Sequence, residues 1–292
     1  MQKYLNKFNI LSNKSKGLLL VIVGNIVVSF DSLLVRLANV SGWDTVFWFG
    51  LFTFLVLGLY SLKTINNINA LIHQTWTKLF VTGVLVSGSL LFFIQAVKLT
   101  HVANAAVIMS SAPIFGALFS WFLLREKTNK GTLLVIFVTI IGLTFVVFGS
   151  LGAGNIFGDI FALTSAAIVS LNFTLWRKYP ETNKMLSMSL GGLILVLVSM
   201  WFAEPFSLEP INYIYLVVMG VFTAPWGRLA SGIATKYLPV AEVSMYRPLN
   251  TVLAPIWVWI VIGEKPLMAT FVGGGIILSA LLVHTVYTNR VC

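Results

Sequence analysis

The chain has 292 residues, of which 58% are hydrophobic and only 10% are charged, and its mean hydropathy is +0.93. Soluble domains have roughly 25% charged and 45–50% apolar residues, so this composition excludes an ordinary soluble protein. The net charge of +10 is distributed along the chain in a way that indicates membrane topology and not nucleic-acid binding.

Apolar stretches follow one another along the whole chain with short connections. A helix needs about 20 apolar residues to cross a hydrocarbon core of about 30 Å. Segments such as Gly131–Gly149 are apolar on every face, whereas the strands of a membrane barrel alternate. We therefore expect an all-α integral membrane protein with ten transmembrane helices, at about 17–36, 44–62, 79–97, 102–124, 132–150, 156–176, 185–203, 211–235, 240–262 and 267–287.

Lysine and arginine residues concentrate on one side of this predicted topology. If the N-terminus is cytoplasmic, fourteen of the nineteen lie in cytoplasmic segments, and Arg36, Lys98 and Lys265 lie outside. The remaining two, Arg228 and Arg247, fall within spans. Because cytoplasmic loops carry the excess of positive charge, both termini are expected in the cytoplasm.

The second half of the chain repeats the first. Ala96–Lys127 aligns with Ala234–Lys265 without a gap, and Gly17–Arg36 aligns with Gly158–Arg177, which places Asp31 on Asn172. Each half has five predicted helices, an odd number, so matching positions face opposite sides of the membrane in an inverted repeat. The expected division is a cytoplasmic N-terminal segment 1–16, a first five-helix repeat 17–150, a connecting loop 151–157, a second repeat 158–288 and a tail 289–292.

The fourth helix of each half ends in a glutamate, in the segments APIFGALFSWFLLREK (112–127) and LNTVLAPIWVWIVIGEK (249–265). Two such five-helix halves resemble the EamA-type branch of the drug/metabolite transporter superfamily, and the resemblance covers nearly the whole chain. Members similar to this carry amino acids, amines, purine-like compounds and other small metabolites, many of them outward, through a central cavity. The resemblance implies a multi-pass protein of the plasma membrane, the bacterial inner membrane. The usual pattern has Glu-Pro or Ser-Pro in the ninth helix, whereas this chain reads YRPLNTVLAP, which adds a cation.

Two arginines lie inside predicted spans, where burial of a charged side chain costs about 2.5–3.5 kcal/mol. Arg247 and Arg228 lie at similar depths in the ninth and eighth spans. Each has a helix-breaking proline nearby: Pro248 directly follows Arg247, and Pro225 precedes Arg228 by three residues. We expect the two guanidinium groups to line one chamber and to attract a carboxylate or phosphate. The alternative for Arg247, that it extends to the headgroups or pairs with Glu242, stays open, as does a structural role for Arg228.

Asp31 is the acidic residue expected within the first span. It is a candidate to bind a substrate ammonium or to carry a proton, and pairing with Arg36 is an equally plausible structural role. Glu126 and Glu264, at the ends of helices, are interpreted as interfacial anchors or interhelical contacts and not as ligands.

Aromatic side chains are abundant and mostly serve packing and interfacial belts in membrane proteins. Trp226 and Tyr246, adjacent to the two arginines, are predicted to enter the cavity and to stack on a flat substrate or on a guanidinium. Asn250 completes the predicted substrate-binding set. Trp257 and Trp259 are expected to face lipid or the interface.

These features predict a secondary transporter, not an enzyme, that works by alternating access on a small amino acid or a related zwitterionic or anionic metabolite, by export or exchange. No cofactor, metal ion or nucleic-acid partner is expected, because histidines and cysteine are not clustered and no nucleotide-binding motif is present. The expected partners are the lipid bilayer, the small-molecule substrate, and either a coupling ion, H⁺ or Na⁺, or a counter-substrate. Alternatives are an exporter of nucleobase-like, amine or drug-like compounds, or, less favoured, a membrane enzyme acting on lipid-linked substrates.

Overall fold

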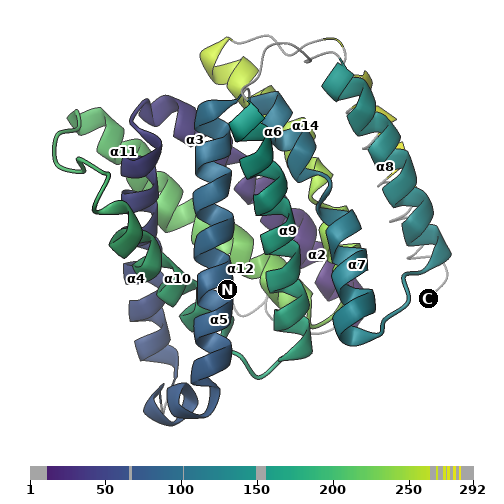
Figure 1. Ribbon diagram of the computed structural model, residues 1–292, viewed down its shortest axis with the longest axis horizontal. Helices are drawn as coiled ribbons and strands as arrows, with labels where there is room; N and C mark the ends of the chain where they lie inside the picture. Colours follow the sequence, from purple (N-terminus) through teal and green to yellow (C-terminus); the bar gives the residue numbers. More distant parts are fainter. Residues whose placement is uncertain are drawn as a thin grey trace.

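The protein is a bundle of α-helices that run roughly side by side in the computed structural model (Figure 1). The structure describes residues 12–65, 68–100, 102–148 and 156–263, and eight single or paired residues between 268 and 283. No strand is found in these ranges, as an all-α membrane protein requires.

The first half contributes α2 (Asn13–Val28), α3 (Phe30–Ala38), α4 (Gly42–Thr64), α5 (Ile68–Leu99), α6 (Val102–Met109), α7 (Ala112–Leu124) and α8 (Lys130–Phe148). The second half contributes α9 (Ile156–Lys178), α10 (Lys184–Ser199), α11 (Pro210–Val218), the π-helix η1 (Met219–Thr223), α12 (Ala224–Ala234), α13 (Val240–Met245) and α14 (Pro248–Ile262).

One to three consecutive helices occupy each of the first nine predicted spans. Five segments are long and apolar enough to cross a membrane, Asn13–Ala38, Gly42–Thr64, Thr75–Leu99, Ile156–Lys178 and Pro210–Ala234, and several shorter apolar helices accompany them. The tenth predicted span, 267–287, and the seam between the halves fall largely outside the described residues. The count of ten therefore stays a prediction.

The helix α5 is longer than the predicted span 79–97. It begins at Ile68, so Lys78 lies within the helix and not in a loop. Neither glycine nor proline occurs between Ile68 and Lys78, so nothing in the sequence stops the helix at the membrane boundary.

Three predicted spans are interrupted, and each interruption has a local cause. At Ser29, between α2 and α3, the hydroxyl donates to the carbonyl of Ile26 at 2.6 Å and competes with the helix ladder. Between α6 and α7, Ser111 donates to the carbonyl of Ile108 at 2.6 Å, and a proline follows in the first turn of α7. Between α13 and α14 the break falls before Pro248, whose missing N–H ends the preceding helix.

Two glycine pairs allow helices from opposite halves to cross closely. A Cβ on Gly24 of α2 would lie 2.6 Å from the carbonyl oxygen of Gly227 in α12. A Cβ on Gly192 of α10 would lie 2.6 Å from the carbonyl oxygen of Gly50 in α4. Small residues at such crossings let backbones approach in a membrane, where packing drives helix association.

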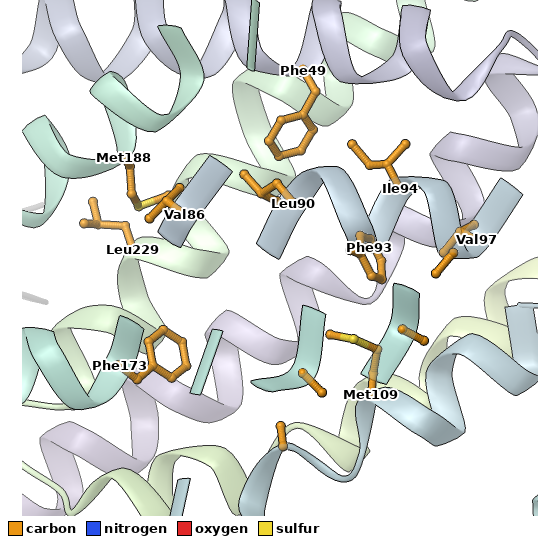
Figure 2. Packing of buried hydrophobic residues seen from close by; sticks show 14 of the residues in the cluster. Phe49, Val86, Leu90, Phe93, Ile94, Val97, Met109, Phe173, Met188 and Leu229 are labelled. Atoms are coloured by element: carbon orange, nitrogen blue, oxygen red, sulfur yellow. The ribbon is translucent and has the colours of Figure 1, made fainter. Parts of the chain in front are cut away.

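The core is built by both halves together. Figure 2 shows side chains of α4 and α5, among them Phe49 and Phe93, in one cluster with Phe173 of α9, Met188 of α10 and Leu229 of α12. Because no half closes its apolar faces alone, the space between the halves is the natural place for a binding site.

The fourth helix of each half ends in the same backbone conformation. Arg125 after α7 has φ 58°, and Gly263 after α14 has φ 83°, both in the left-handed region. They occupy matching positions of the sequence repeat, each directly before a glutamate. A residue in this conformation commonly terminates a helix.

Candidate functional site

A cavity lies in the middle of the bundle between helices of both halves. Its space not filled by atoms is about 440 Å³, but only about 30 Å³ accommodates the centre of a water-sized molecule. One water needs roughly 10–15 Å³ on that measure, so the cavity in this conformation has room for a few waters. The polar lining residues are Asn25, Ser89, Asn172, Arg228, Ser231 and Arg247, and the others include Val28, Val86, Leu90, Val169, Phe173, Trp176 and Met188.

Arg228 and Arg247 both line this cavity, as the sequence predicted for one shared chamber. They come from α12 and from the break between α13 and α14, two elements of the second half. The structure therefore brings together two positive groups at membrane depth, where each needs a partner.

Arg228 is neutralised by Asp31. Its Nη2 lies 3.2 Å from Oδ2 of Asp31, whose side chain is only 1% exposed. The guanidinium carbon also stands 5.2 Å from the ring centre of Phe49 and 5.6 Å from that of Phe93. Pairing of Asp31 with Arg36, one of the two expectations, is not what the structure has, because Asp31 turns inward, where α12 crosses α2.

The second oxygen of Asp31 is held by a distorted helix. Thr223 donates its hydroxyl to Oδ1 at 2.5 Å. Thr223 ends the π-helix η1, directly before the proline-containing first turn of α12. A π-helical turn redirects side chains and is frequent at functional sites, and here it delivers a hydroxyl to the carboxylate.

Arg247 is the second arginine of the cavity, and its environment differs from that of Arg228. Its guanidinium carbon lies 5.8 Å from the ring centre of Phe173, and within the described part of the chain no carboxylate is at ion-pair distance from it. Pairing with Glu242, the alternative expected from sequence, is therefore not found. Glu242 instead lines a separate pocket with Glu126.

Several polar atoms at the site have no hydrogen-bond partner among the described residues. They are Nη1 of Arg228, Oδ1 of Asn172 and Nε1 of Trp176, all on residues that line the cavity. Asn172 and Trp176 are 2% and 1% exposed. Buried polar groups are nearly always paired, so this set can bind a polar ligand or ordered water.

The other predicted site residues are placed differently. Tyr246 is fully buried and Asn250 is half-buried, and Oδ1 of Asn250 has no hydrogen-bond partner in the described segments. Neither residue lines the cavity. Trp226 is 40% exposed and packs edge-on against Tyr60, with ring centres 5.8 Å apart. The prediction that Trp226 enters the cavity is wrong, because its position in α12 places it on the face opposite Gly227 and Arg228.

Trp257 also differs from expectation, since it packs inside the bundle. Its indole N–H donates to the Ser29 hydroxyl at 2.8 Å, and its ring stacks on Phe30 at 4.6 Å. Trp257 therefore ties α14 to the kink between α2 and α3. Trp259, two residues later, is 40% exposed.

One end of the cavity is closed by Trp176 and an ion pair beyond it. A Cβ on Gly232 would meet the Trp176 ring at 2.4 Å, so the indole packs directly on the α12 backbone. Beside it, Nη2 of Arg177 lies 2.7 Å from Glu126, and Nη1 donates to the carbonyls of Thr235 and Leu238 at 3.0 and 2.9 Å. Glu126 is thus an interhelical contact, as expected, that joins α7 to the ends of α9 and α12.

Sequence reasoning did not place Asn172 and Asn25 at the site. Asn172 had a signal, because it is the repeat counterpart of Asp31. Asn25 lies close before Asp31 in the same span, and its amide donates to the carbonyl of Val21 at 2.7 Å. Phe173 and Trp176 gave no signal, because aromatic residues are common in all the spans.

Comparison with known proteins agrees with this architecture. A solved crystal structure of a protein superposes with a TM-score of 0.77 over 94% of this chain and 99% of its own, at 17% identity, which is a likeness of fold alone. An uncharacterized transporter of Archaeoglobus fulgidus is 25% identical over 72% of this chain and 76% of its own. Solute carrier family 35 member G1 of mouse is 26% identical over 51% of this chain and 40% of its own.

The apolar helices with a charged cavity at their centre are those of a multi-pass membrane transport protein. The profile of the EamA-like transporter family matches residues 15–148 and again 156–286. The chain belongs to this family, which is part of the drug/metabolite transporter superfamily, and it is a transporter with two repeats.

Proposed function

We propose that the protein is a secondary transporter that moves a small zwitterionic or anionic metabolite, such as an amino acid, across the bacterial inner membrane by alternating access. Export or exchange is the proposed direction. The observation that carries the proposal is that Arg247, in a central cavity whose other arginine is neutralised by Asp31, has no carboxylate at ion-pair distance among the described residues.

The charge balance of the cavity favours a ligand with one carboxylate. Arg228 and Asp31 cancel, so the net charge of the cavity wall is that of Arg247. A guanidinium binds a carboxylate through two parallel hydrogen bonds. The unpaired Oδ1 of Asn172 is an acceptor, which suits an N–H donor on the same ligand. A carboxylate and an amino group together describe an amino acid or a close relative.

The small size of the cavity supports a transport cycle. A metabolite does not fit a space that holds a few waters, so the helices must separate for it to enter. One end of the cavity has a candidate gate, formed by Trp176 and by the ion pair between Arg177 and Glu126. Opening at one end and closing at the other is alternating access.

Asp31 is the group through which transport couples to a proton in this proposal. In this proposal the substrate carboxylate is bound by Arg247 and also accepts from the nearby Arg228, which draws the guanidinium of Arg228 away from Asp31. A buried carboxylate without a cation is costly, so Asp31 then takes up one proton, which it releases when the pair re-forms. In export one proton moves for each substrate, whereas in exchange a counter-substrate replaces the proton; Na⁺ coupling is the competing outcome.

Transport in proteoliposomes tests the proposal. Uptake of labelled amino acids, amines and nucleobases is measured with and without a pH gradient. The proteins compared are wild type, Arg247→Gln, Arg247→Lys and Lys63→Gln. Lys63→Gln is the control, because the Lys63 side chain is exposed at the end of α4. A lost hydrogen bond to a charged group costs about 1.5–3 kcal/mol, so Arg247→Gln should lower kcat/KM for a carboxylate substrate about tenfold or more. Arg247→Lys should retain only part of the wild-type kcat/KM, because lysine keeps the positive charge but lacks the bidentate geometry of arginine.

Each outcome of this assay has a distinct meaning. No flux of any solute under any gradient would refute secondary transport by this chain. Flux that Arg247→Gln leaves unchanged would refute the site. Carboxylate transport by Asp31→Asn that still follows the pH gradient would remove Asp31 from coupling and leave the substrate class standing.

A further inference from the structure

A second pocket with a basic wall lies beside the Trp176 end of the central cavity, between the α9–α10 connection and α12. It contains about 540 Å³ of space not filled by atoms, counting the part open to solvent. Pro180, Glu181, Thr182 and Asn183 form its rim. None of these four residues lines the central cavity or takes part in the transport site described above.

Lys184 brings a buried positive charge to this pocket. The residue is 5% exposed, and its Nζ has no hydrogen-bond partner among the described residues. The ammonium lies over the Trp176 ring, whose centre is 5.9 Å away. A buried ammonium without an acceptor is costly, so the position calls for an anion that the protein itself does not supply.

The acidic residue of the rim does not fill that role. Glu181 attracts Lys184 but is bound to Lys78, with which it forms an ion pair. That hydrogen bond from Lys78 holds the pKa of Glu181 below its usual value, so the carboxylate stays ionised and engaged. The charge of Glu181 is therefore balanced from outside the pocket.

Three further groups favour an anion. Lys236 lines the pocket from the far end of α12 and is close enough to repel Lys184 electrostatically. Thr182 is 2% exposed and its hydroxyl has no partner among the described residues. The N-terminus of α10, which has 16 residues, adds the positive end of its helix dipole, although Asn183 already accepts from its first N–H groups.

The remaining wall of the pocket is apolar. Met185, Leu229 and Ile233 continue from the lysines along α10 and α12. A basic end followed by an apolar groove between helices matches a phosphate group attached to a hydrocarbon chain. The end of the helix bundle that contains this pocket also carries four basic residues, Arg177, Lys178, Lys184 and Lys236. The charge distribution of the sequence predicts that this end of the bundle is cytoplasmic.

We propose that this pocket binds a phosphate-bearing anion through the ammonium groups of Lys184 and Lys236 and the hydroxyl of Thr182. Lysine suits phosphate as a point charge, and threonine donates the accompanying hydrogen bond. The same chemistry comes from the headgroup of an anionic phospholipid or from a soluble phosphate ester. The apolar wall makes the phospholipid the expected source.

Binding is measured on the purified full-length chain. One arm titrates phosphatidylglycerol, with phosphatidylcholine as reference, and follows bound lipid by native mass spectrometry together with the shift in Tm. A second arm titrates glycerol phosphate and inorganic phosphate. The variants are Lys184→Met and Lys236→Gln, with Lys63→Gln as a matched control, since Lys63 is an exposed lysine at the same end of the bundle.

Phosphatidylglycerol should bind more tightly than phosphatidylcholine, and each pocket variant should weaken it about fivefold, while the control leaves it unchanged. Lys184→Met should also raise the Tm in the absence of anionic lipid, because it removes an unpaired buried charge. Lysine-dependent binding of glycerol phosphate instead would support the pocket with a soluble ligand. Binding of neither, or binding indifferent to both lysines, would overturn the proposal.

Discussion

Replacement of Asp31 by asparagine should destabilise the protein, because it leaves Arg228 charged and buried without its partner. Asparagine has nearly the same shape and keeps an oxygen that accepts the hydroxyl of Thr223. What the variant loses is the charge opposite the guanidinium, 3.2 Å away. The substitution therefore isolates the electrostatic contribution of the pair.

The expected size follows from the burial of both groups. Removing one partner of a buried ion pair costs about 3–5 kcal/mol. The Arg228 side chain is 18% exposed, lines a cavity that holds waters, and keeps its contacts with Phe49 and Phe93. The contacts with the two rings are the same in both proteins and cancel, but water that enters the cavity can solvate the guanidinium, so we expect a loss at the lower end of this range, about 3 kcal/mol.

Equilibrium unfolding of the purified protein in mixed micelles, followed by tryptophan fluorescence, measures this loss. Asp44→Asn is the matched control. Asp44 is also buried, but its carboxylate accepts hydrogen bonds from Ser41 and from the backbone N–H of Glu204 and does not face an arginine. The control variant should lose about 1 kcal/mol of unfolding free energy. The double variant Asp31→Asn/Arg228→Gln should recover at least half of the single-variant loss. A loss for Asp31→Asn no larger than that of the control would refute the ion pair as a stabilising contact.

Two further variants test the helix crossing and the closed end of the cavity. Gly192→Ala should cost about 2 kcal/mol of unfolding free energy, because its methyl group meets the Gly50 carbonyl, whereas Gly131→Ala, with open space around it, should be neutral. Equal effects of the two would contradict the close crossing. Ser231→Cys, in a background without the native cysteine, reports access to the cavity through its labelling by an impermeant thiol reagent on the cytoplasmic side. Glu126→Gln should raise this labelling rate severalfold, because it weakens the ion pair with Arg177 that closes this end of the cavity. An unchanged labelling rate would show that other contacts close it.

The interior charges could be identified from sequence because a charge in hydrocarbon is rare and costly. Arg228 and Arg247 were predicted to share a chamber, and both line the central cavity. The same reasoning could not choose the partner of Asp31, because Arg36 is near in sequence and Arg228 is near only after α2 and α12 cross. Local pairs are visible in a sequence, and pairs made by a crossing of distant helices are not.

The aromatic residues show a different limit. Trp226 was predicted to face the cavity and is exposed on the opposite face of α12, while Trp176, which received no prediction, closes one end of the cavity. In a soluble protein the polar face of a helix shows which side is outside. In a membrane the lipid is as apolar as the core, so both faces of a helix carry the same residue types.

Sequence by itself determined the membrane environment, the two repeats and the presence of unusual buried charge, because hydropathy, repetition and rare residues are all properties of the chain in one dimension. Only the tertiary structure decided that Asp31 neutralises Arg228 and that no carboxylate of the described segments pairs with Arg247. That outcome depends on the distance between helices and on their rotation about their own axes. Both are set by close glycine contacts between helices that are distant in the sequence, which no local pattern specifies.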